Sequence, residues 1–182
     1  MPLIDKTYFI GELDIPNTNN TSVAERLNHF IVKHEREFLI SILGYELYTE
    51  FAAGLAATTV DSLWTDLRDG AEYYDDRDRL YKWDGLRNAT TKQSIIANYV
   101  YFHFMRDQAT QTTGLGEMTN VAENAVRVSA NHKMCRAWNE MYHAIGSLIH
   151  FLTVNADYYD TWDKGTAYNI LYAYSPINNL GL

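Results

Sequence analysis

Cysteine is nearly absent from this sequence, since Cys135 is the only one among 182 residues. A single thiol excludes an internal disulfide and a zinc site built from several cysteines. Long apolar runs are also missing, because the longest uncharged stretches, 141–156 and 165–182, are interrupted by polar residues, glycine or proline. Neither stretch suits a membrane span. The N-terminus lacks the features of a secretory signal, so we expect folding in the cytoplasm and no membrane partner.

Positive charge is scarce as well. The chain has 15 Lys and Arg against 23 Asp and Glu, which gives a formal net charge of −8. This sign disfavours a protein whose main work is to coat the phosphates of DNA or RNA. The acidic excess lies in the first half, where residues 1–91 hold 16 acids and 9 bases.

Tyrosine, in contrast, is abundant, with 14 copies beside 7 Phe and 4 Trp. Tyrosine suits surfaces that contact a partner yet tolerate water, although it also occurs on half-buried helix faces. Five tyrosines follow residue 157 and three lie between 70 and 85, so eight fall outside the expected long helices. This distribution favours subunit contact over core packing alone.

Apolar residues at helical spacing predict a mainly α fold, with three long and two short helices in a bundle. Ser22 and Glu25 match a capping box at the start of the first long helix, and Gly44 ends it. Residues 7–10 are expected to be extended. The other helices are expected over residues 45–55, 60–68, 90–112 and 129–155, the last beginning at Ser129.

A small β-hairpin is predicted at about residues 71–85, where aromatic pairs flank the polar run 75–78. Its charge suggests that it projects into solvent or onto a neighbour, and two strands alone are marginally stable. The run lacks the spacing of a calcium loop, so we interpret it as a polar tip. Trp83 is expected to be a packing anchor.

The chain is predicted to form a helical domain over residues 1–155 and an extended aromatic C-terminal arm over residues 156–182. An arm with so few charges and so many rings either folds back over its own bundle or docks on another subunit. The candidate interface residues are Tyr73, Tyr74, Tyr81, Tyr158, Tyr159, Trp162, Tyr168, Tyr172 and Tyr174.

Catalytic motifs are weak. Glu140 and His143 have the Glu-x-x-His spacing of one half of a di-iron site, but no second copy exists. His150 follows seven residues later, and a hydrogen-bonded pair of half-buried histidine rings is the simpler interpretation. Cys135 lies within a helix, as a structural thiol does. We therefore expect no catalytic residue, metal or cofactor; an enzyme centred on Glu140, His143 and His150 stays open as an alternative.

The order of segments resembles the head-to-tail adaptor (connector) proteins of tailed bacteriophages, the small helical neck proteins that form a ring beneath the portal. The likeness runs over most of residues 3–155. The passages that carry it are FLISILGYELYTEF at 38–51, YKWDGL at 81–86, IANYVYFHFMRD at 96–107, QTTG at 111–114, EN at 123–124 and AWNEM at 137–141.

The resemblance implies a structural virion protein without enzymatic turnover, made in the host cytoplasm. It implies a ring of this chain, twelvefold to match a portal, with the portal and the downstream neck or tail proteins as partners. DNA would pass through the channel without sequence-specific binding. The hairpin and the long arm exceed what a minimal adaptor needs, so another virion ring or tail-neck role, or a non-viral helical protein-binding module, remains an alternative.

Overall fold

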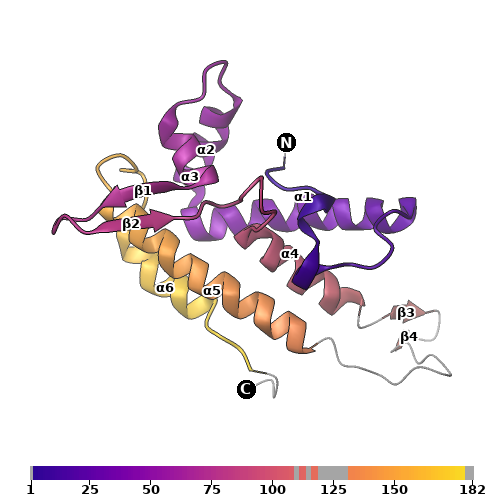
Figure 1. The fold of residues 1–182 in the computed structure, drawn as a ribbon. Helices are drawn as coiled ribbons and strands as arrows, with labels where there is room; N and C mark the ends of the chain where they lie inside the picture. Colours follow the sequence, from indigo (N-terminus) through magenta and orange to yellow (C-terminus); the bar gives the residue numbers. More distant parts are fainter. Residues whose placement is uncertain (1, 109–110, 114–115, 119–130, 179–182) are drawn as a thin grey trace.

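The computed structural model describes residues 2–108, 111–113, 116–118 and 131–178. In this part of the chain the fold is mainly helical, as predicted. The long helices are α1 (Thr21–Leu43), α4 (Ile95–Gln108) and α5 (Asn131–Val154), and the short ones are α2 (Tyr45–Ala56), α3 (Ser62–Asp69) and α6 (Ala167–Ala173). Helix α4 packs against both α1 and α5, and α6 lies along α5 (Figure 1).

Two helices begin at residues other than those predicted, because of local capping. Asn20, not Ser22, caps α1: its side-chain oxygen accepts a hydrogen bond of 3.0 Å from the Ser22 amide. Helix α4 begins only at Ile95, since the Ser94 hydroxyl accepts the amides of Ile96 and Ala97 at 3.1 and 3.3 Å. The predicted cap of α5, Ser129, lies outside the described residues.

Two predicted segments have a different structure. Residues 7–10 are not an extended strand, because the Asp5 carboxylate accepts the Thr7 amide at 2.7 Å and starts the 3₁₀ turn η1 (Lys6–Tyr8). A second 3₁₀ turn, η2 (Gly11–Leu13), follows. Helix α4 also stops before its predicted end at 112, and β3 (Gln111–Thr113) pairs there with β4 (Gly116–Met118).

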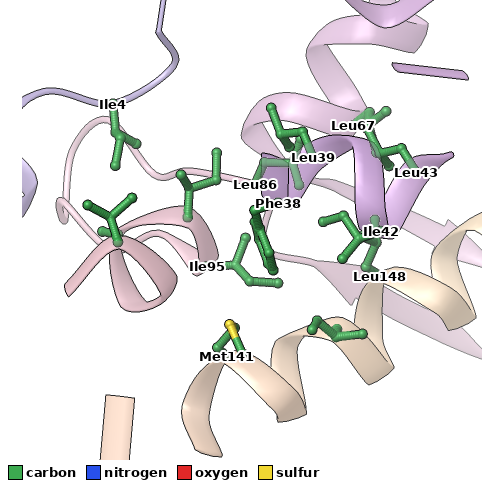
Figure 2. Close-up of a cluster of buried hydrophobic side chains, with 14 of the residues drawn as sticks. Ile4, Phe38, Leu39, Ile42, Leu43, Leu67, Leu86, Ile95, Met141 and Leu148 are labelled. Carbon is green, nitrogen blue, oxygen red and sulfur yellow. The ribbon is translucent and has the colours of Figure 1, made fainter. Parts of the chain in front are cut away.

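One buried cluster joins the N-terminal segment to helices α1, α3, α4 and α5. Figure 2 shows its side chains converging from these elements, with Phe38 between Leu86 and the α5 side. The labelled members are Ile4, Phe38, Leu39, Ile42, Leu43, Leu67, Leu86, Ile95, Met141 and Leu148. Because helices α1, α3, α4 and α5 all contribute labelled side chains, the loss of one large side chain is felt across the bundle.

The predicted hairpin is present as β1 (Ala71–Tyr74) paired antiparallel with β2 (Leu80–Trp83). Asp75 closes the tip, where one carboxylate oxygen accepts the amides of Arg77 and Arg79 at 3.0 and 2.9 Å. At its base, Gly70 and Gly85 have φ of +99° and +88°. A Cβ on Gly70 would lie 2.4 Å from the Trp83 carbonyl oxygen, so this close backbone approach requires glycine.

Candidate interaction surfaces

The two faces of the hairpin have different surroundings. Tyr73 is 8% exposed and its hydroxyl lies 2.6 Å from Nδ1 of His150 on α5, while the half-buried Tyr81 ring sits 4.5 Å from the same histidine ring. Tyr74 and its cross-strand partner Leu80 point to the other face. Tyr74 is 64% exposed and Leu80 is 55% exposed. Among the three predicted hairpin contacts, Tyr73 and Tyr81 therefore pack against the chain's own helix. Tyr74 and Leu80 form the hairpin patch.

The C-terminal arm folds back over its own bundle in the described residues, so it is not extended throughout. Tyr159 and Trp162 are buried, and the Tyr159 hydroxyl donates to the Leu63 carbonyl oxygen at 2.8 Å. Burial raises the pKa of Tyr159. Tyr174 is half-buried against the rings of Phe38 and Trp138, 5.7 and 5.8 Å away. These three predicted interface residues are internal contacts, because folding removes their rings from solvent.

Three other tyrosines of the arm remain open to solvent. Tyr158 is 71% exposed, and Tyr168 and Tyr172 are each 77% exposed. Tyr168 and Tyr172 are four residues apart on α6 and therefore share one face of that helix. We call this pair the arm patch. It lies within the uncharged stretch 165–182.

A cleft of about 640 Å³ lies where the N-terminal turn, the end of β2, the loop before α4 and α5 meet. Two of its charged lining groups pair with each other, since Lys82 lies 2.8 Å from Asp84, and a third, Glu12, lies 3.0 Å from Arg136 outside the lining. Lys92 covers the Tyr8 ring at 4.9 Å. Sequence reasoning missed this cleft, because its walls come from segments that no local pattern connects.

The histidines are arranged differently from the prediction. His143 and His150 do not pair, since seven residues separate them by about 10 Å along a helix, and His150 contacts Tyr73 instead. Glu140 lies 3.9 Å from Arg136. Among the described residues, no group of three or more His, Cys, Asp or Glu could hold a metal ion.

A histidine pair that the sequence did not predict lies between α1 and α4. The rings of His34 and His103 stack with centroids 4.6 Å apart and planes inclined by 10°. Burial, with a smaller contribution from the neighbouring His34, lowers the pKa of His103 to about 4. Burial also lowers the pKa of His34. Both rings are therefore neutral near pH 7 and act as part of the aromatic packing.

Comparison with protein-family models finds no match, and comparisons with curated proteins and with solved structures find none either. In the part of the chain that the structure describes, no helix is long and apolar enough to cross a membrane.

Proposed function

We propose that this chain is a structural virion protein, a head-to-tail adaptor that forms a ring beneath the portal of a tailed bacteriophage. Copies made in the host cytoplasm bind one another and the portal, and the downstream neck or tail proteins bind the ring. About twelve copies would match the portal, as the sequence resemblance implies. The role is rigid bridging, and the chain carries out no reaction.

The observation that carries this proposal is that one chain exposes two pairs of large apolar side chains on different elements. The hairpin patch, Tyr74 and Leu80, and the arm patch, Tyr168 and Tyr172, lie on elements far apart in sequence. A ring closes through head-to-tail contacts, in which one surface of each copy meets a different surface of the next. Figure 1 shows the hairpin running away from the helices to a free tip, as an element that reaches a neighbour must.

The charge of the chain supports the same role. A net charge of −8 repels DNA phosphates, so a channel built from such copies lets DNA pass without adhesion. Individually modest contacts suffice, because each copy in a closed ring is held on two sides.

Removing either patch is expected to stop self-association, and mixing the two variants is expected to restore one contact. Tyr74→Thr with Leu80→Thr removes the hairpin patch and keeps β-propensity; Tyr168→Gln with Tyr172→Gln removes the arm patch and keeps helix propensity. Each variant alone should associate at least about tenfold more weakly than the parent. An equimolar mixture should give a heterodimer, since each variant keeps the surface that the other lacks.

Native mass spectrometry distinguishes these species directly. Tyr45→Gln is the matched control, because Tyr45 is 68% exposed on α2, an element that belongs to neither patch, and its loss should leave association unchanged. If either double variant still forms the parent's oligomers, or if the mixture contains only monomers, the head-to-tail contact between these patches is wrong.

A further inference from the structure

An aromatic seam joins helices α1 and α4. Phe30, His34 and Phe38 are spaced four residues apart on α1 and therefore share one face of that helix. The His34 ring stacks on His103 of α4, with centroids 4.6 Å apart. Next to this pair, the Phe38 ring stacks on Tyr99 at the same distance, and Phe30 lies 5.3 Å from the His34 ring. Two basic rings are thus built into a contact that is otherwise aromatic.

The ring nitrogens of this pair are poorly placed to carry protons. In the described part of the chain, Nε2 of His103 is buried and has no hydrogen-bond partner. Nδ1 of His34 is buried as well, and Glu37 Oε2, 3.1 Å away, lies outside hydrogen-bonding geometry. A protonated imidazole has an N–H on both nitrogens, so a proton on His103 leaves a buried donor without an acceptor. Protons on both rings would also set two like charges face to face.

Charged groups of both signs surround the pair. Glu37 favours a proton on either ring, and Asp107 of α4 favours one on His34. Lys33 disfavours a proton on either ring, and Arg106 disfavours one on His103. Because these charges oppose one another, burial is the largest influence, and it lowers the pKa of both histidines.

The elements packed on the other end of the seam bring no group that titrates in acid to it. Trp138 of α5 and Tyr174 of the arm each contact the Tyr99 ring, at 6.3 and 6.1 Å. Burial raises the pKa of Tyr99 to about 12 and also raises the pKa of Tyr174, so both phenols stay neutral. Among the rings of the seam, acid therefore changes the charge of the two histidines alone.

We propose that the His34–His103 stack is an acid-sensitive contact, which holds α1 against α4 while both rings are neutral and opens locally when they take up protons. Separation of the two helices lets water hydrate the charged rings, which removes the cost of burying them. Helix α4 also packs along α5, so this opening precedes unfolding of the bundle as a whole. The inference is independent of the proposed function.

Hydrogen exchange of the full-length chain, followed by mass spectrometry, tests the opening. Rates at about pH 7 and about pH 4.5 are compared after correction for the intrinsic effect of pH on exchange. We expect protection to fall at least about tenfold in peptides covering residues 30–38 and 99–107, because the folded pKa of His103, about 4, lies well below the ordinary 6.5. Protection in residues 141–152 of α5 should change less than about twofold. An equal fall in all three segments, or no fall in the first two, would overturn the proposal.

Variants show whether the histidines cause the effect. His103→Phe keeps a ring of similar size that cannot take a proton, and it should reduce the fall in protection at least about threefold; His34→Phe makes the same test from α1. His29→Gln is the matched control, since His29 is exposed on the same helix, and it should behave as the parent does. Glu35, whose pKa burial raises, titrates in the opposite sense but is present in every variant. Circular dichroism checks that each variant folds. If both phenylalanine variants lose as much protection in acid as the parent, the stack is not acid-sensitive and the proposal is wrong.

Discussion

Replacing Trp83 with alanine is expected to lower the free energy of unfolding by about 4 kcal/mol, as large-to-small changes of buried aromatic residues do. Trp83 is only 1% exposed, and its ring stacks on Phe151 of α5 with centroids 6.1 Å apart. Its Nε1 donates to the Leu67 carbonyl oxygen at 3.0 Å, and the variant loses this buried hydrogen bond, although the Leu86 amide still donates to the same oxygen at 3.4 Å. Urea denaturation followed by circular dichroism measures the change.

Tyr74→Ala is the matched control for this experiment. The side chain belongs to the same hairpin but points to solvent, so its removal should change stability by no more than about 0.5 kcal/mol. If Trp83→Ala and Tyr74→Ala lowered the free energy of unfolding by similar amounts, the division of the hairpin into a face packed on α5 and an exposed face would be wrong.

Glu35→Gln is expected to gain stability relative to the parent as the pH rises, by about 2 to 3 kcal/mol between about pH 5 and about pH 8. The Glu35 carboxylate is buried in α1 and accepts the amides of Leu3 and Ile4 at 2.7 and 3.3 Å. Burial raises its pKa from 4.5 to about 7, although these hydrogen bonds, the amino-terminal charge and Arg87 oppose the shift.

The sign follows from proton binding. Because the folded pKa of Glu35 lies above the unfolded one, the folded chain holds a proton between about pH 4.5 and 7 that the unfolded chain has released. Stability therefore falls as the pH rises through this window, and the glutamine variant lacks this fall. The hydrogen bond lost with glutamine costs the same at every pH, so it does not affect the slope.

Only the difference in unfolding free energy between the parent and the Glu35→Gln variant isolates the contribution of Glu35. His103 titrates in the opposite sense: its folded pKa of about 4 lies below the unfolded 6.5, so its contribution is lost as the pH falls through that window. This effect is present in both proteins and cancels. Unfolding curves at the two pH values give the difference, and a difference that does not change with pH would contradict a buried, raised-pKa carboxylate.

The sequence predicted the elements of the hairpin but not which aromatic residue faces inward. Alternation places Tyr73 and Tyr74 on opposite faces, and either register satisfies that rule. The choice depends on two contacts of the hairpin with α5, Tyr73 with His150 and Trp83 with Phe151, which join segments distant in sequence. For the same reason, the sequence predicted both Tyr73 and Tyr74 as contact residues, whereas in the structure Tyr73 is buried and Tyr74 is exposed.

The remaining differences have local or long-range physical causes. Asn20 competes with Ser22 to cap α1, and both are favourable capping residues, so propensity alone does not select one. Glu35 is buried because the N-terminal segment folds over it from 31 residues away, which no periodicity indicates. The arm packs in cis through Tyr159, Trp162 and Tyr174, whereas composition allowed either cis or trans packing.

The most direct test of the proposed adaptor function is to mix this chain with a tailed-phage portal protein and measure the mass of any complex. If the proposal is right, native mass spectrometry or electron microscopy should find a closed ring of about twelve copies bound to one end of the portal. A chain that remains monomeric, both alone and in the presence of the assembled portal, would contradict the adaptor function.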